Sequence, residues 1–229
     1  MTMKKLRLIL GDQLNHKHSW YQEKSKETTY VLMEMGQELT YTTHHIQKVV
    51  AFFLAMRSFG EHLKSQGHQV IYVNLDDSRN KQSLTDNLKW LIKENNIEKF
   101  EYQLPDEYRL DQQLSTFSES IEIETESFDT EHFLTERHDL KDFFEGKKML
   151  IMENFYRMMR KKYDILMDGS GPVGDKWNYD HENRKKMPTS TTIPSVKSFQ
   201  KSVQEIVDLL NDQNIKTIGR IDPKNFIWP

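Results

Sequence analysis

Three polar side chains near the amino terminus have the types and spacing of a ligand site. Asp12, in the pair Gly11-Asp12, directly follows a run of branched apolar residues, and Glu38 and Tyr41 follow a second such run. Two carboxylates and a phenol can hydrogen-bond a polyhydroxylated or heteroaromatic ligand. The same residues also have an ordinary structural interpretation, with Gly11-Asp12 as a turn, Glu38 as an acid in a first helical turn and Tyr41 as packing.

The segments that carry these side chains are predicted to be parallel strands. Residues 6–10 and 28–35 are short apolar runs, which are typical of strands buried on both faces. In an open parallel sheet the carboxyl ends of the strands meet at one edge, where such folds bind ligands. Asp12, Glu38 and Tyr41 are therefore expected to converge on one pocket at that edge.

Further strands alternate with amphipathic helical patterns up to about residue 130. The additional strand-like segments lie at residues 70–75, 100–104 and 121–125. A long helical pattern lies between the second and third strands, with Thr42 or Thr43 as its expected N-cap and Gly67 as its stop. This alternation predicts an α/β domain over residues 1–130, an open, mostly parallel, five-stranded Rossmann-like sheet flanked by helices.

Residues 131–229 have a different character and are predicted to be a helical extension and interdomain linker. Helical patterns cover residues 131–163 and 198–210, separated by a glycine-rich loop and a Pro/Ser/Thr-rich stretch. The chain finishes on Phe226-Ile227-Trp228-Pro229, which is unusually apolar for a terminus. We expect a cut inside a longer protein; a tail docked on its own domain is the alternative.

Composition restricts the classes of function. The 229 residues include no cysteine, which excludes disulfides and thiolate-bound zinc or iron–sulfur clusters from this chain. The net charge of −3 argues against a protein that is generally coated with nucleic acid. No apolar run reaches the length of a membrane span and no signal peptide opens the chain, so a cytoplasmic protein without membrane contact is expected.

Common catalytic and phosphate-binding motifs are absent. Neither a G-x-G-x-x-G fingerprint nor a Walker-type loop follows the first strand, and no G-x-S-x-G elbow occurs. His44 and His45 are adjacent, and adjacent side chains on a helix point about 100° apart, so they cannot easily share a metal. Surface or capping roles are expected for them, and no catalytic or metal-binding residue is assigned.

Two segments combine aromatic and charged residues without specifying one chemistry. Residues 154–163 carry four cations beside aromatic rings, typical either of a phosphate contact or, as we favour, of a solvated helix face. Residues 177–184 are dense in hydrogen-bonding groups next to a glycine-rich loop, which suggests a fixed side-chain network used for function or for interdomain packing.

Three motifs together resemble the deoxyribodipyrimidine photolyase-related family, the bacterial iron–sulfur cryptochromes and (6-4) photolyases. They are GDQL at residues 11–14, Y-x-x-HH-x-x-K at residues 41–48, and PVG-x-KWN-[FY]-D-x-ENR at residues 172–184. The resemblance runs from Leu6 to about Arg184. It implies an N-terminal α/β antenna domain followed by a helical half that carries FAD, the cysteines of an iron–sulfur cluster and most of the lesion-binding surface.

The resemblance also implies a cofactor for the pocket. Family members bind the antenna chromophore 6,7-dimethyl-8-ribityllumazine at the sheet edge, and the matching positions are Gly11, Asp12, Glu38 and Tyr41, with Met33 lining the ring. The motif at residues 172–184 maps between the two halves, so its implied task is interdomain packing.

The chain is therefore expected to be the N-terminal antenna half of a photolyase- or cryptochrome-like flavoprotein. The intact protein would repair pyrimidine (6-4) photoproducts with light, and DNA would be contacted only by the intact protein, whereas this chain alone would be catalytically silent. Its expected partner is the C-terminal FAD domain. The alternatives are a stand-alone α/β ligand-binding or light-signalling module and, less favoured because no phosphate loop is visible, a nucleotide-binding enzyme.

Overall fold

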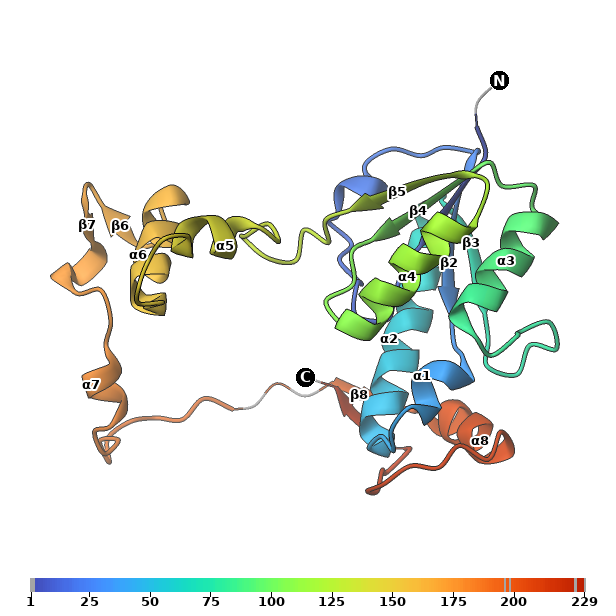
Figure 1. Ribbon diagram of the computed structural model, residues 1–229. Helices are drawn as coiled ribbons and strands as arrows, with labels where there is room; N and C mark the ends of the chain where they lie inside the picture. The colour runs from blue at the N-terminus through green and yellow to red at the C-terminus, as the bar shows by residue number, and fades with distance from the viewer. Residues whose placement is uncertain (1–2, 196, 198, 225, 229) are drawn as a thin grey trace. The chain divides into compact units, whose positions relative to one another are not determined.

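The computed structural model describes residues 3–195, 197, 199–224 and 226–228, and the chain divides into two compact units (Figure 1). The first unit is Met1–Phe133 together with Lys197–Pro229, and the second is Leu134–Val196. The sequence-based division joined residues 131–229 into one extension. The structure instead groups the last part of the chain with the α/β unit.

The first unit is built on a five-stranded parallel sheet. Its strands are β1 (Lys5–Leu8), β2 (Thr28–Met33), β3 (Gln69–Val73), β4 (Lys99–Gln103) and β5 (Glu124–Phe128). Their order is β3-β2-β1-β4-β5, and Leu8 in the central strand pairs with Val31 and Tyr102. The predicted Rossmann-like α/β fold is confirmed. The fifth strand begins three residues later than predicted, because Ile121 still caps the preceding helix.

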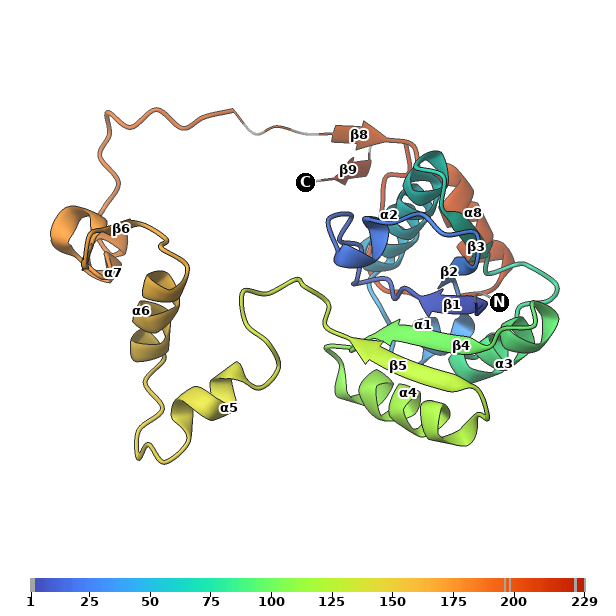
Figure 2. The same cartoon turned by 90° about the horizontal axis from the view of Figure 1, so that it is seen from above.

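Helices cover both faces of this sheet, as Figures 1 and 2 show: α2 (Ile46–Ser65) on one face, α3 (Leu84–Glu94) and α4 (Tyr108–Ser120) on the other. Alternation along the strands produces the two layers. Leu6 and Leu8 belong to the core shared with α3 and α4, whereas Tyr30 and Leu32 pack with the buried residues of α2. Both faces of β2 are therefore buried, as its continuous apolar run predicts.

The long helix α2 has 20 residues and well-defined ends. The His45 side chain accepts a hydrogen bond from the Gln47 amide at 3.2 Å, so His45 is the N-cap. The prediction of Thr42 or Thr43 was wrong, because these residues lie in a turn before the helix. Gly67 adopts φ +88° just past the helix and confirms the predicted stop. In the described part of the chain, no helix is long and apolar enough to cross a membrane.

The last part of the chain packs on α2. The helix α8 (Gln204–Asp212) contributes Val203 at its N-cap and Ile206 and Leu210 to a core with α2. It follows a short strand, β8 (Phe199–Lys201), which pairs antiparallel with β9 (Phe226–Trp228). The predicted helix at 198–210 thus begins six residues later, since its first residues form a strand.

The segment after α8 also pairs with the chain that leads into α2. Ile218 receives a hydrogen bond from the Ile46 amide at 2.9 Å and donates one to the His44 carbonyl at 3.0 Å. The next residue, Gly219, has φ +82° and lies so close to His45 that a Cβ atom would be 1.9 Å from Nε2. The His44-His45 pair is therefore fixed from a distant part of the chain.

The second unit is small and has few buried residues. Its elements are α5 (Asp139–Phe144), α6 (Met152–Lys162), β6 (Met167–Asp168), β7 (Gly171–Pro172), η2 (Val173–Asp175) and α7 (Asp180–Asn183). The helical pattern predicted for residues 131–163 thus forms two separate helices. Among the described residues of this unit, only Phe155, Arg160 and Pro172 are buried.

Arg160 organises the loop that follows α6. Its guanidinium donates to the carbonyls of Ile165 at 3.0 Å, of Leu166, and of Trp177 at 3.5 Å. The Trp177 ring lies 5.3 Å from the guanidinium carbon of Arg160 and, at the same distance, from that of Arg157. The cationic face of α6 is therefore used at least partly for packing within this unit, in agreement with the dense side-chain network expected there.

Candidate functional site

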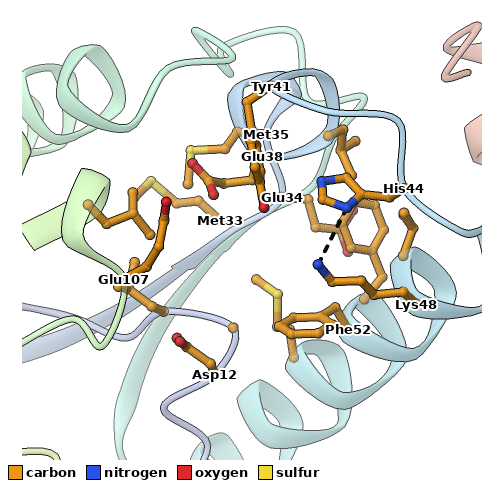
Figure 3. Close-up of a pocket in the computed structure, with 17 residues that line it drawn as sticks. Asp12, Met33, Glu34, Met35, Glu38, Tyr41, His44, Lys48, Phe52 and Glu107 are labelled. Carbon is orange, nitrogen blue, oxygen red and sulfur yellow. Dashed lines mark hydrogen bonds between the residues drawn. The ribbon is translucent and has the colours of Figure 1, made fainter.

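A cavity of about 220 Å³ opens where β1 and β2 end (Figure 3). Its walls come from the loop after β1, the end of β2, the short helix α1 (Gly36–Thr40), helix α2 and the start of α4. All five residues predicted from the sequence line it: Gly11, Asp12, Met33, Glu38 and Tyr41. Their convergence is thus observed, while their binding of a ligand stays a prediction.

The topology explains why the cavity forms here. The chain passes from β1 to β2 on one side and returns to β4 on the other side of β1, so the crossovers diverge beside the central strand. Loops that diverge at the carboxyl edge leave a crevice, which is where open α/β sheets bind ligands. Glu107 and Leu110, from the β4–α4 connection, close the cavity from that second side.

Gln13 fixes the loop that carries Gly11 and Asp12. Its amide oxygen accepts a hydrogen bond from the Leu10 amide at 3.0 Å, and its amide nitrogen donates to the Gln103 carbonyl at 3.1 Å. The side chain is buried, so these bonds compete little with water. Sequence reasoning missed Gln13, because its partner on β4 is 90 residues away.

Gly11 is required because the loop passes close to α2. A Cβ atom at this position would lie 2.9 Å from Cδ1 of Phe52 and 3.0 Å from Sδ of Met56, both of which line the cavity. We expect Gly11→Ala to push these side chains aside, at a cost of about 1–2 kcal/mol in the free energy of unfolding measured with urea. Gly171→Ala, whose nearest contact would be an ordinary 3.9 Å, is the control and should change it by less than about 0.5 kcal/mol. Equal effects would contradict the close approach.

Asp12 places a carboxylate at the cavity. Partial desolvation, and next the charge of Asp106, raise the pKa of this carboxyl group from its usual value. The side chain is nevertheless exposed by surface area, so water screens most of this effect and Asp12 is ionised at neutral pH. It can therefore accept hydrogen bonds from a ligand.

Glu38 is held in place from α4. Arg109 donates to both of its carboxylate oxygens, at 3.0 and 2.7 Å, and Gln37 donates to Oε1 at 3.1 Å. The Arg109 guanidinium also lies 4.5 Å from the centroid of the Tyr41 ring. The pKa of the Arg109 guanidinium is raised, chiefly by its hydrogen bond to Glu38. Two of the predicted ligand residues are thus joined through an arginine that sequence reasoning did not identify.

His44 and Lys48 form the opposite wall, as Figure 3 shows. The Lys48 ammonium lies 3.4 Å from Nδ1 of His44. An ammonium can only donate, so Nδ1 accepts and the proton of the neutral imidazole is on Nε2. The ring is buried, yet Nε2 has no partner among the described residues. A buried donor without an acceptor destabilises the folded protein. A ligand with an acceptor atom at this wall would satisfy the Nε2–H group of His44.

The structure separates the two adjacent histidines. The capping role expected for this pair is confirmed for His45, whereas the surface position expected for His44 was wrong. The backbone of His44 and His45, directly before α2, pairs with Ile218, and the two side chains point in different directions. Because His44 precedes α2, which begins at Ile46, helical spacing gives no signal that places it beside Lys48.

Glu34, directly after β2, is a buried acid that also lines the cavity. Arg57 donates to its two oxygens at 2.7 and 3.1 Å, the Tyr72 hydroxyl at 2.8 Å and the Leu75 amide at 3.1 Å. Burial, and next the charge of Glu34, raise the pKa of Tyr72. Because four donors satisfy Glu34, its main task is to join β2 to α2 and β3. The sequence shows it only as an acid inside an apolar run.

His18, in the sequence His16-Lys17-His18, also has a structural task. Its Nδ1 accepts from the Trp20 amide at 3.0 Å and its Nε2 lies 2.8 Å from the Asp129 carbonyl, which assigns the proton to Nε2. The ring is buried and caps the 3-10 helix η1 (Ser19–Tyr21). Within the described residues, no three His, Cys, Asp or Glu side chains are grouped as metal ligands would be.

The sheet order and the position of the pocket define a Rossmann-like α/β protein with a cavity at the ligand-binding edge of that class. Comparison with known families then identifies the group: the model of the deoxyribodipyrimidine photo-lyase-related protein family matches residues 7–226, and the chain belongs to this family. The family predicted from the three sequence motifs is thereby confirmed.

Two relatives differ in length. A (6-4) photolyase of Agrobacterium fabrum is 34% identical over 227 residues, which cover 98% of this chain but 43% of the photolyase. An uncharacterized protein, R852, of Acanthamoeba polyphaga mimivirus is 26% identical over 199 residues, which cover 83% of this chain and 99% of R852. The chain thus spans less than half of the photolyase and nearly all of the viral protein.

Proposed function

We propose that this chain is the antenna module of a photolyase- or cryptochrome-like protein and binds 6,7-dimethyl-8-ribityllumazine in the cavity at the sheet edge. The observation that carries the proposal is the convergence of Gly11, Asp12, Met33, Glu38 and Tyr41 on one cavity. These residues come from separate elements: the loop after β1, the end of β2, and α1 with the turn that follows it. Convergence of this kind is what a ligand site requires.

The residues present fit such a chromophore. A ribityllumazine has an N–H group, ring carbonyls and chain hydroxyls, and so needs both acceptors and donors. Glu38 and Asp12 supply acceptors on one side, and the unpartnered Nε2–H of buried His44 supplies a donor on the other. Met33 and Phe52 provide apolar contact for a flat ring. The cavity is slightly below the roughly 300–1,000 Å³ typical of ligand pockets, so we expect the ring inside and the ribityl chain at the open mouth.

The task of this chain's own residues is to bind and orient. When bound, the chromophore supplies light absorption and passes the excitation energy to a flavin elsewhere in the intact protein. Glu38 and His44 fix the ring by hydrogen bonds from opposite walls, and Gly11 lets the loop after β1 lie close to α2. Efficient transfer needs one orientation, which rigid parallel strands and a buried helix provide better than mobile loops.

We also propose an activity for the intact protein. We infer light-driven repair of pyrimidine (6-4) photoproducts, with FAD, an iron–sulfur cluster and most DNA contacts in a C-terminal half that this chain does not span. The chain has no cysteine, so thiolate ligands for such a cluster would come from that half. The relative described as a (6-4) photolyase, of which this chain covers 43%, supports this inference.

The surface of the second unit supports a partner of this kind. Few of its residues are buried, and it carries most of the exposed large apolar side chains among the described residues. They are Leu134, Leu140, Met149, Leu150, Ile151, Met152, Tyr156, Tyr163, Ile165, Leu166, Val173, Tyr179, Met187 and Ile193. An unusual number of exposed apolar side chains in one small unit is typical of a surface that a partner covers. We propose that the C-terminal FAD domain covers them in the intact protein.

The prediction that tests the pocket is the loss of chromophore binding in Glu38→Ala. A charged acceptor contributes about 1.5–3 kcal/mol, so the dissociation constant for ribityllumazine should rise by about 10- to 150-fold in an absorption titration. Glu61→Ala is the control, because Glu61 is an exposed acid on α2 that pairs with Lys64 at 2.8 Å and does not line the cavity. It should bind as the wild type does. Unchanged binding by Glu38→Ala would contradict the site.

The second candidate is a stand-alone α/β ligand-binding or light-signalling module. The viral relative favours it, because 199 aligned residues cover 99% of that protein. Immunoblotting of the native protein in its source cells separates the two possibilities. A band near the 27.4 kDa of this chain supports the stand-alone module, and a band about twice as large supports the antenna half.

A further inference from the structure

Arg109, in the first turn of α4, connects two acids of the candidate site, Glu38 and Glu107. Its guanidinium donates to Glu38 at 3.0 and 2.7 Å and to Glu107 at 3.0 Å through Nε and again at 3.0 Å through Nη2. Both carboxylates line the cavity, whereas Arg109 is not among the lining residues. The arginine therefore acts on the pocket from behind its acidic wall.

The same guanidinium supports the aromatic residue at the mouth. Tyr41 is 52% exposed, and its ring lies between Arg109, 4.5 Å away, and the His44 ring, whose centroid is 4.9 Å away. An exposed tyrosine without such neighbours would sample several rotamers. Stacking on a guanidinium and contact with a buried imidazole restrict it to one.

Local structure cannot hold these groups by itself. Glu38 and Tyr41 lie in and directly after α1, a helix of five residues, which is too short to be stable alone. Glu38 and Glu107 carry like charges and would repel each other without a cation between them. Only a planar fork can bridge two carboxylates and stack on a ring at the same time, and arginine has this geometry whereas lysine does not.

We propose that Arg109 is a positioning residue, which sets the orientation of Glu38 and Tyr41 for a heteroaromatic ligand with an N–H edge. The inference rests on the proposed function and extends it to a residue outside the cavity. A ligand would meet a carboxylate whose Oε2 keeps one lone pair free while Arg109 holds its direction. Binding would then need little reorganisation of this wall.

The test compares Arg109→Met with Arg79→Met. Arg79 is a matched control, since it also donates two side-chain bonds to one acid, Asp77, and lies over a ring, Trp90, but does not touch an acid that lines the cavity. We expect the dissociation constant for ribityllumazine to rise at least about tenfold in Arg109→Met and by less than about twofold in Arg79→Met. Arg109→Lys should recover only part of the affinity. Because Arg109 is partly exposed, the melting temperature should change by less than about 4 °C in all three variants.

Crystal structures of the wild type and of Arg109→Met distinguish this inference from the proposed function. If the wild type does not bind ribityllumazine, the proposed function fails. The positioning role then depends on whether Glu38 and Tyr41 move in Arg109→Met. Displaced or disordered side chains support it; unchanged side chains overturn it, whichever ligand the wild type binds. Equal weakening by Arg79→Met, or full rescue by Arg109→Lys, would also overturn it.

Discussion

Glu34→Ala is expected to destabilise the first unit by about 3 kcal/mol, the lower part of the range for breaking a buried ion pair. The side chain is completely buried and accepts from Arg57, Tyr72 and the Leu75 amide. Its removal leaves these donors without their acceptor in a site that water reaches poorly. Arg57 retains some exposure and a second acid, Glu205, which keeps the cost from being larger. Urea unfolding followed by circular dichroism measures it.

The control for this prediction is Glu61→Ala on the same helix as Arg57. Glu61 is 73% exposed and bonds to Lys64 three residues away, so its loss should cost less than about 1 kcal/mol. Like effects for Glu34→Ala and Glu61→Ala would show that Glu34 is hydrated and does not join the strands. Arg57→Met should reproduce most of the loss seen for Glu34→Ala, because it leaves the carboxylate buried with fewer donors.

The second large effect is expected for Gly219→Ala. At φ +82° a side chain strains the backbone, and the new Cβ would lie 1.9 Å from Nε2 of His45. His45 caps α2, so the ring and the segment around Ile218 cannot both keep their positions. We expect a loss of at least about 2 kcal/mol in the free energy of unfolding, together with faster hydrogen exchange at the Ile46 and Ile218 amides.

Gly146→Ala separates the two causes of this effect. Gly146 has φ +72°, but a Cβ there would meet nothing within 4 Å. It therefore has the backbone strain without the collision, and should cost only about 1 kcal/mol. If the two variants lose equal stability and the amides of Ile46 and Ile218 stay protected, residues 215–221 do not hold the start of α2.

The sequence predicts the sheet and one wall of the site well, for a local reason. Apolar runs that end in Gly11-Asp12 and before Glu38 report strands and their carboxyl ends directly, and parallel strands must bring those ends together. The opposite wall is harder to predict. His44 is buried at a point where Ile218, far along the chain, pairs with the backbone beside it.

Long-range pairs account for most of what sequence reasoning missed. Arg109 meets Glu38 across 71 residues and Arg57 meets Glu34 across 23, and neither pair leaves a periodic trace. The prediction for the second unit was wrong for another reason. Its helical pattern over residues 131–163 is interrupted because so few of its side chains are buried that no core extends the helices.

The most direct test of the central claim is an absorption titration of this 229-residue chain with 6,7-dimethyl-8-ribityllumazine. The proposed pocket predicts saturable binding of one chromophore per chain, with a change in its visible band as the ring leaves water. At ~1 mM chromophore, a site with a binding free energy of only about −4 kcal/mol would be half filled. The absence of a spectral change up to that concentration would contradict the proposed pocket.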